Sequence, residues 1–422
     1  MAERSWRADA VLVGWGALTF AALLASFSSF RPVRDALVLD GKPDDIPWLF
    51  IGTFVAGLVA SPLWSQFLAK RQKRRVVPIA FHVFAACLLV FAVLVNSTWV
   101  DHVAVGRAFY IWSSIFNLFV VSVFWSLLAD LIGHEKAKSL FGPIAAGGTV
   151  GGFVAPLVTE LLVTHVGVAG ILVLSVGWLE LAVIGVMRLR HYGEAFITKV
   201  PDEPTPSTAF TGLERVSRSY YLLGIVGYVM CTATAATFLY MEQAGIVKDA
   251  FEHLAKDAAR VARTDFFASL DVWTAGVTFV VQTLFARALL TWLGPAIVLC
   301  ILPLVQLTAI TLLSTSGSLT TLAIVMVATR ASTHGLTRPA RETLFTVVDR
   351  DDKYHAKNVI DTIVYRFGDM VASWTHKGLL ALAAGSTALV VAAVPLTIGW
   401  IALAIGLGVG VRRRARSDDR ND

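Results

Sequence analysis

Charged residues are scarce in this chain. Asp, Glu, Lys and Arg make up 16% of its 422 residues, whereas a typical soluble domain has about 25%. Hydrophobic residues make up 56%, and the mean hydropathy is +0.68. This composition excludes a water-soluble globule, a coiled coil, a collagen and a disordered chain. Because a helix that crosses a bilayer needs roughly 20 residues, the apolar side chains suffice for about twelve such helices.

Cysteine is also rare, and the sequence patterns of common catalytic sites are missing. Cys87, Cys231 and Cys300 lie far apart in apolar runs, which speaks against a disulfide framework or a zinc site. The sequence contains neither a Walker motif nor the paired histidines of a zincin helix, and it has no recognisable Ser/His/Asp set. We therefore expect no enzymatic activity, no bound metal and no cofactor.

The apolar runs predict an all-α integral membrane protein with about twelve transmembrane helices. The predicted spans cover 10–38, 47–69, 76–96, 103–131, 140–164, 168–190, 219–242, 265–286, 295–314, 319–338, 358–384 and 387–411. A proline-containing break divides them into two sets of six. The predicted domains are an N-terminal half, a cytoplasmic linker, a C-terminal half and a basic tail, at 1–190, 191–218, 219–411 and 412–422. This 6+6 layout resembles the major facilitator superfamily.

The distribution of basic residues predicts the orientation in the membrane. About 25 of the 36 Lys and Arg residues fall on the side that carries both termini, so the positive-inside rule places both termini in the cytoplasm and the protein in the plasma (inner) membrane. We therefore interpret the net charge of +6 as the result of basic residues that orient the protein in the lipid bilayer. We expect no nucleic-acid partner, and nothing in the sequence requires more than one chain.

One amphipathic stretch, 246–263, breaks the pattern of apolar spans. Its apolar residues recur at helical spacing, and Glu252 and Lys256 form a favourable i,i+4 pair. We interpret it as an extracellular extension of the seventh or eighth span, with a gating or lipid-surface helix as the alternative.

Ionisable and polar residues inside the spans are the candidates for function, because such groups are costly in a membrane. The predicted substrate-binding residues are Arg31, Arg34, Asn117, Arg330, Tyr365 and Arg366. The predicted coupling or charge-network residues are Asp35, Glu180, Asp369 and Lys377. Arginine dominates the basic members, and its planar fork suits carboxylate or phosphate, so the set favours an anionic solute.

These residues also have purely structural interpretations. Arg366 and Asp369 are three residues apart and could pair on one helix face. Arg31 and Arg34 could extend to the outer headgroups instead of binding a solute. Their functional interpretation depends on Pro32, which we expect to interrupt the first helix and expose polar backbone.

A glycine-rich run in the predicted fifth span, 141–152, superficially resembles a phosphate-binding loop. It lacks the Lys-Ser/Thr ending of that loop and lies inside a membrane span. We therefore predict helix packing, with Gly147, Gly148, Gly151 and Gly152 allowing another helix to approach closely.

Three segments carry a family resemblance: 34–38, 125–142, and 338–345 with its continuation to Gly368. They resemble the ATP/ADP nucleotide translocases of plastids and intracellular bacteria, a branch of the major facilitator superfamily. The resemblance implies nucleotide exchange that depends on charged residues at five positions, namely Arg34, Glu135, Lys138, Arg341 and Glu342. The chain departs from the family in having arginine at 34 and 341 where the translocases tend to have lysine, and in being shorter.

Four of those residues have a second interpretation. Glu135, Lys138, Arg341 and Glu342 are predicted at the cytoplasmic ends of spans, where they could form a gate that latches one conformation rather than contact the substrate.

The sequence therefore predicts a secondary active transporter that moves an anionic, phosphorylated solute such as ATP or ADP by alternating access and exchange. One alternative is a proton-linked exporter of a non-nucleotide metabolite, drug or amphiphile, with Glu180 or Asp369 titrating. The second is a membrane sensor or assembly partner that transports nothing.

Overall fold

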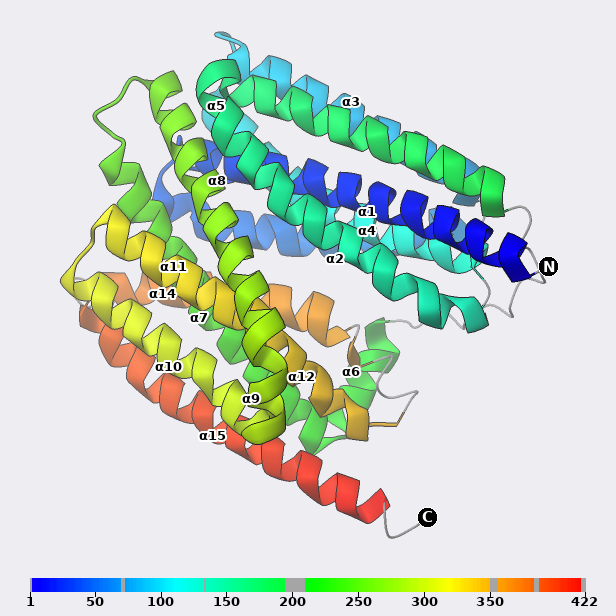
Figure 1. Cartoon of the computed structure of the whole chain (residues 1–422). Coiled ribbons are helices and arrows are strands. Elements are labelled where there is room, and N and C mark those ends of the chain that lie inside the picture. The colour runs from blue at the N-terminus through cyan, green and yellow to red at the C-terminus, as the bar shows by residue number, and fades with distance from the viewer. Residues whose placement is uncertain are drawn as a thin grey trace. The chain divides into compact units, whose positions relative to one another are not determined.

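The computed structural model describes residues 2–69, 73–132, 134–193, 209–349, 356–357, 359–382 and 387–418. Within these ranges every regular element is a helix (Figure 1). Nine of the described helical stretches are long and apolar enough to cross a membrane. Helices suit that environment because they satisfy all their backbone hydrogen bonds internally. The prediction of an all-α membrane protein is confirmed.

The helices follow the predicted spans. The first part of the chain forms α1 (Ala2–Val38), α2 (Ile46–Ala69), α3 (Lys73–Asn96), α4 (His102–Leu131) and α5 (His134–Gly193). The second part forms α6 (Ala209–Ser217), α7 (Tyr220–Ala250), α8 (Lys256–Val280), α9 (Arg287–Trp292), α10 (Gly294–Thr315), α11 (Leu319–Ser332), α12 (Arg338–Leu344), α14 (Tyr365–Leu382) and α15 (Thr387–Asp418). Short 3-10 turns occupy Pro43–Asp45 and Phe345–Val347, and π-helical turns occupy Val281–Ala286, Thr333–Thr337 and Ile360–Val364.

The long helix α5 contains two of the predicted spans. Its helical geometry is broken at Gly167, where φ is 68° and ψ is 179°. A positive φ is accessible to glycine at little cost because glycine has no Cβ atom. The break lies between the predicted spans 140–164 and 168–190, so their separation is confirmed.

Contacts among the helices divide the chain into two compact units. Unit 1 comprises Met1–Lys42, Val55–Asp202 and Phe251–Val272, and unit 2 comprises Pro43–Phe54, Glu203–Ala250 and Trp273–Asp422. Each unit holds most of one predicted half. The short segments 43–54 and 251–272 group with the unit that does not contain the rest of their half. The predicted domain limits stay a prediction, and most of the predicted linker lies outside the described residues.

Helices α1, α3, α4 and α5 lie side by side in unit 1 (Figure 1). Glycine allows α5 to approach α1, since a Cβ atom at Gly147 would lie 2.2 Å from the carbonyl oxygen of Ala17, and one at Gly151 would lie 2.0 Å from that of Ala21. A Cβ atom at Gly148 would lie 2.4 Å from the Phe20 ring. The predicted packing role is confirmed for these three glycines. It is wrong for Gly152, which has open space around its Cα atom.

Aromatic rings fill the space between α1, α3 and α4. Phe30 of α1 contacts Phe109 and Phe116 of α4, with ring centroids 5.6 Å and 5.1 Å apart. Phe91 of α3 lies 4.8 Å from Phe109, and Trp112 stacks on Phe109 at 5.7 Å. Each such pair adds about 0.5–1.5 kcal/mol beyond the burial of its area.

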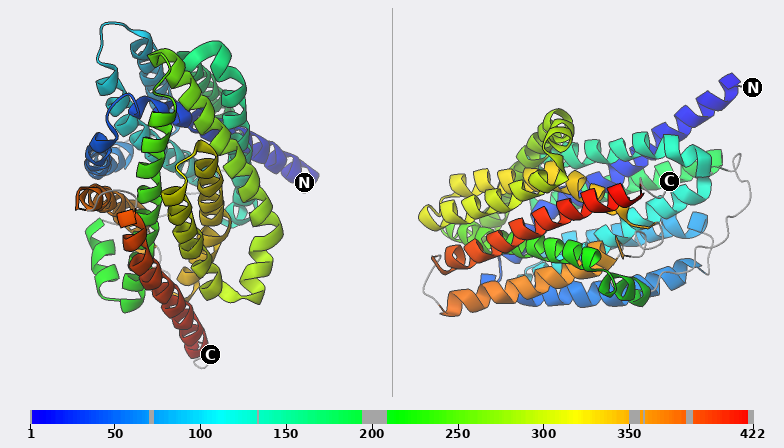
Figure 2. Two further views of the ribbon diagram at one scale, coloured as in Figure 1. Left: turned by 90° about the vertical axis from the view of Figure 1, so that its left-hand side faces the viewer. Right: turned by 90° about the horizontal axis from the view of Figure 1, so that it is seen from below.

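Hydrogen bonds as well as apolar contacts join the helices of unit 2. Helices α10 and α15 lie side by side (Figure 2), and Gly408 leaves room for Ala296 of α10. The hydroxyl of Tyr228 on α7 donates a hydrogen bond to the Leu299 carbonyl at 2.9 Å. The buried amide Nε2 of Gln306 donates to the Ala235 carbonyl at 2.6 Å. Both bonds join α7 to α10, and each satisfies a polar group inside an apolar core.

Candidate functional site

Helix α1 carries Arg31 and Arg34 past a proline without a break. The helix continues through Pro32 to Val38, so the predicted interruption of the first span is wrong. Proline has no backbone N–H, and only the Ser28 carbonyl loses its partner within the helix. One missing bond is tolerated because the packed neighbours of α1 hold the helix in place.

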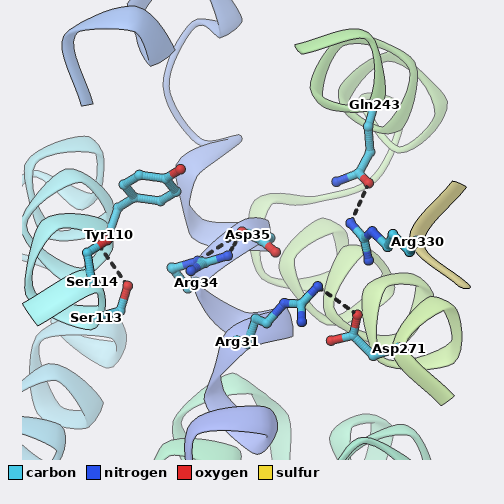
Figure 3. Close-up of polar contacts among 9 residues, drawn as sticks. All are labelled: Arg31, Arg34, Asp35, Tyr110, Ser113, Ser114, Gln243, Asp271 and Arg330. Carbon is cyan, nitrogen blue, oxygen red and sulfur yellow. Dashed lines mark hydrogen bonds and ion pairs between the residues drawn. The ribbon is translucent and has the colours of Figure 1, made fainter. Parts of the chain in front are cut away.

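Both α1 arginines are paired with acids of unit 1 (Figure 3). A guanidinium nitrogen of Arg31 lies 3.2 Å from Oδ1 of Asp271 on α8. Arg34 lies 2.7 Å from Oδ1 of Asp35, and its guanidinium lies over the Tyr110 ring, 5.1 Å from the centroid. These contacts differ from the predicted alternative in which both side chains extend to lipid headgroups.

A second charge cluster in unit 1 joins the end of α1 to the start of α8. Nε of Arg260 lies 2.8 Å from Oδ2 of Asp40, and a guanidinium nitrogen of Arg263 lies 3.6 Å from Oδ1 of the same carboxylate. The two arginine side chains are only 4% and 7% exposed. Both lie in the amphipathic segment 246–263, which forms the end of α7 and the first turns of α8 around a short turn. This arrangement agrees with the interpretation of the segment as an extension of those two helices.

The remaining predicted residues of unit 1 lie apart from these pairs. Asn117 is half-buried on α4 and has no hydrogen-bond partner within the described part of the chain. Glu180, on the second half of α5, lies 3.7 Å from Nδ1 of His82 on α3. No contact among the described residues joins either one to Arg31 or Arg34.

In unit 2, four residues form a polar seam between α7 and α14: Thr237, Glu242, Asp369 and His376. The Thr237 hydroxyl donates to Oδ1 of Asp369 at 3.0 Å, and Nε2 of His376 lies 2.9 Å from Oε1 of Glu242. Asp369 and His376 are seven residues apart, so they lie on the same face of α14, two turns from each other. The seam therefore fixes α14 against α7 at two levels.

Further polar contacts extend from this seam. A guanidinium nitrogen of Arg330 on α11 donates to Oε1 of Gln243 at 3.1 Å (Figure 3), and Gln243 is the chain neighbour of Glu242. Lys377, next to His376, donates from Nζ to the Asp44 carbonyl at 3.0 Å. The predicted residues Arg330, Asp369 and Lys377 are thus linked to α7 and to the turn before α2.

Arg366 is different from the other predicted arginines. It lies one turn before Asp369 on α14, yet the two form no ion pair, and Asp369 bonds to Thr237 instead. Within the described residues, Arg366 has no hydrogen-bond or ion-pair partner. The two charges still interact along this helix face, so the structural interpretation of Arg366 and Asp369 as a pair stays a prediction. Tyr365 precedes Arg366 and is the first residue of α14 after a π-helical turn.

The predicted gate residues of unit 2 contact their own unit. Arg341 lies 2.8 Å from Oδ1 of Asp361, and Glu342 lies 2.6 Å from Nζ of Lys357. Both pairs join the end of the tenth predicted span to the start of the eleventh. The side chains of Glu135 and Lys138 lie outside the described residues, so their gate role stays a prediction.

Four residues of these contacts were not predicted from the sequence, namely Thr237, Glu242, Gln243 and His376. A signal existed, because His376 lies inside a predicted span and Glu242 at the end of another. Asp40, Arg260 and Arg263 were missed because they fall at or beyond the predicted ends of spans, where charges are common.

Comparisons with known proteins agree with this architecture. The fold is similar to a bacterial homologue of the iron transporter ferroportin in an inward-facing state, with a TM-score of 0.64, 12% identity, and coverage of 96% of this chain and 98% of that one. The nucleoside transporter NupG (D323A mutant) has a TM-score of 0.63 and 12% identity over 96% and 99% of the two chains. This chain has the major facilitator fold.

A third structure with this fold is a POT family transporter in complex with 5-aminolevulinic acid, with a TM-score of 0.63 and 10% identity over 95% of this chain and 96% of that one. No family model matches the sequence, and no curated protein matches it. At these identities the likeness extends to the fold, so the substrate has to be argued from the side chains.

Proposed function

We propose that this protein is a secondary active transporter that moves an anionic, phosphorylated solute across the membrane by alternating access. The fold is similar to those of a nucleoside transporter, a bacterial homologue of an iron transporter and a POT family peptide transporter. Transporters of this kind bind their solute near the middle of the membrane, on polar groups of the helices. The proposal then depends on which polar groups are available there.

Arg366 is the observation that carries the anionic assignment. It lies near the middle of the predicted eleventh span, it is half-buried, and no acceptor bonds to it within the described residues. An arginine in an apolar span without an acceptor is costly. A bound carboxylate or phosphate would supply the missing acceptor through two parallel hydrogen bonds. Arg366 is therefore assigned to direct contact with the anion, and Tyr365 and Asn117 to its orientation.

The paired arginines are assigned a secondary role. Arg31 and Arg34 hold Asp271 and Asp35, so binding a second anionic group at these positions requires the ion pairs to exchange partners. The displaced carboxylates, which are 10% and 6% exposed, would then need new partners, because a buried charge without its partner is costly. Binding in this way would also disrupt contacts that hold α1 to α8.

Nucleotide exchange is the specific form of the proposal. It is supported by the resemblance of three segments to the ATP/ADP translocases, by the arginine-rich candidate set, and by a fold shared with a nucleoside transporter. Arginine at 34 and 341 in place of the translocases' lysine preserves the charge and adds the bidentate geometry.

The test is ligand-dependent thermal stabilisation of the purified full-length protein in detergent, with ATP, ADP, glucose 6-phosphate and inorganic phosphate as probes. A ligand that binds the folded state raises the melting temperature with its concentration. We expect the nucleotides to stabilise the protein and labelled nucleotide to enter liposomes preloaded with unlabelled nucleotide.

Arg366→Gln is the decisive variant, and Arg287→Gln is its control because Arg287 is an exposed arginine of the same unit. Loss of a charged hydrogen bond of about 1.5–3 kcal/mol weakens binding roughly 10- to 150-fold. The control should bind as the parent does. Wild-type affinity in Arg366→Gln would refute the assignment of that arginine, and no response to any anion in the wild type would refute the anionic substrate.

A further inference from the structure

Hydrogen-bond donors without an acceptor gather around the ion pair that joins α12 to the π-helical turn before α14. The side chains of Arg338 and Arg366 have no hydrogen-bond or ion-pair partner among the described residues, and the hydroxyl of Tyr365 has none either. Nε of Arg341 is buried and lacks an acceptor within the same residues, although another nitrogen of its guanidinium binds Asp361. Four side chains of unit 2 thus offer donors that no described group of the protein accepts.

The ion pair of Arg341 and Asp361 fixes the level at which these two segments meet. Arg341 belongs to α12, and Asp361 belongs to the π-helical turn. Arg338 lies one helical turn before Arg341 on the same face of α12, and Tyr365 lies about one turn after Asp361. Because consecutive spans cross a membrane in opposite directions, both steps lead from the ion pair into the span. They bring Arg338 to the level of Tyr365 and of the next residue, Arg366.

The charges around Tyr365 agree with this placement. Its side chain interacts electrostatically with three arginines and one carboxylate, namely Arg338, Arg341, Arg366 and Asp369. The Asp369 carboxylate accepts a hydrogen bond from Thr237, and Arg341 is held by its own carboxylate partner. Positive charge therefore exceeds negative charge around the Tyr365 hydroxyl, and both other arginines keep their N–H groups available.

The number of these donors favours a tetrahedral anion over a planar one. A guanidinium presents two parallel N–H groups that match a pair of oxygens. A carboxylate has one such pair, which a single arginine occupies. A phosphate monoester has three terminal oxygens, so two arginines can each bind a pair while a tyrosine hydroxyl donates to the same group. Its charge of about −1.5 to −2 at neutral pH is also larger than that of a carboxylate.

We infer that Arg338 is a substrate-binding residue that holds a phosphate group of the solute together with Tyr365 and Arg366 and selects it over a carboxylate. This inference rests on the proposed function and deepens it, because Arg366 alone accepts either anion. The Arg338 side chain is exposed, so a dissolved solute can reach it. Arg341 holds Asp361 and thereby sets the position of α12 against the start of α14.

The experiment uses two pairs of ligands that share a nucleoside or a sugar and differ in the anionic group. AMP is compared with adenosine 5′-carboxylate, and glucose 6-phosphate with glucuronate. Thermal stabilisation of the full-length protein in detergent gives the affinity for each ligand. We expect the wild type to bind the phosphate member of a pair more tightly. Arg338→Gln should weaken phosphate binding roughly 10- to 150-fold and reduce the preference for phosphate over carboxylate.

Two controls separate the role of Arg338 from general effects of charge and stability. Arg287→Gln removes an exposed arginine of the same unit and should change neither the affinity nor the preference. The melting temperature without ligand shows whether Arg338→Gln is folded. If it is not, Arg338→Lys replaces it, because lysine keeps the charge but lacks the planar fork, and the preference for phosphate should still fall.

Three results would overturn the inference: an Arg338→Gln variant with the affinity of the parent, a wild type that binds carboxylate as tightly as phosphate, or competition by phosphatidylglycerol. The last result would assign the site to a lipid headgroup. Failure of this inference is distinguishable from failure of the proposed function. Phosphate binding that depends on Arg366 but not on Arg338 retains the transporter of phosphorylated solutes, whereas a wild type that binds no phosphate ligand rejects both.

Discussion

The two units of this protein are held together by different chemistry. In unit 1, aromatic rings and glycine contacts fill the core, and its candidate arginines are paired with Asp271, Asp35 and Asp40. In unit 2, polar side chains donate hydrogen bonds that join α7 to α10, through backbone carbonyls, and to α14, through the Asp369 carboxylate. The predicted arginines of unit 1 thus have carboxylate partners, whereas Arg366 of unit 2 has no ion-pair partner within the described residues.

Backbone geometry shows the same contrast. The π-helical turns in the described part of the chain all belong to unit 2, at Val281–Ala286, Thr333–Thr337 and Ile360–Val364. One begins three residues after Arg330 and another ends two residues before Arg366. A π-turn inserts a residue into the helical repeat, rotates the following side chains and is frequent at functional sites.

The largest effect is expected from breaking the charge balance of unit 1. Asp40→Asn leaves Arg260 and Arg263 buried without their shared carboxylate, which should cost about 3–5 kcal/mol of stability. The matched control is Asp257→Asn, since Asp257 also contacts Arg260 but is 93% exposed. Thermal unfolding in detergent measures both. Equal stability of the two variants would show that the cluster does not hold unit 1 together.

The next effect concerns the close contact of α1 and α5. A methyl group at Gly151 meets the Ala21 carbonyl, so Gly151→Ala should destabilise the protein by about 1–3 kcal/mol through overpacking. Gly152→Ala, one residue further along the same helix, has open space and should be neutral or slightly stabilising. The difference between their melting temperatures tests whether α1 and α5 are tightly packed at Gly151. A lower melting temperature for Gly152→Ala than for Gly151→Ala contradicts it.

A smaller effect is expected in the polar seam of unit 2. Thr237→Val keeps the shape but removes the donor to Asp369, at a cost of about 1–2 kcal/mol because a buried acceptor loses its partner. Thr232→Val is the control, because that hydroxyl bonds only within its own helix, to the Tyr228 carbonyl. If both variants unfold at the same temperature, the seam contributes nothing beyond ordinary packing.

The smallest effect is expected at the ion pair of Glu342 and Lys357, which is partly exposed. Glu342→Gln should change stability by about 0–1 kcal/mol, as is usual for exposed pairs. A transport rate that falls while the melting temperature stays constant would indicate a role of Glu342 in the transport cycle. Unchanged transport leaves it as a surface ion pair.

The fold could be predicted well from the sequence. Transmembrane helices are recognisable as apolar runs of about 20 residues, and the close packing of α5 is recognisable from its glycines, so both can be read from short stretches of the chain. The site could be predicted only in part. Arg31, Arg34, Arg330 and Arg366 are visible as arginines in apolar runs, but their partners are not. Asp40 and Arg260 are 220 positions apart, and Gln243 and Arg330 are 87 apart. Only the packing of distant helices brings such pairs together.

The break at Gly167 has a practical consequence for experiments on intact membranes. A straight helix of the 60 residues of α5 would be about 90 Å long, three times the thickness of a hydrocarbon core, so the chain has to fold back. It does so around a single residue with no loop. The residues on either side are exposed but remain helical, whereas proteases cleave preferentially at loop tips, so we expect 134–193 to survive limited digestion as one fragment.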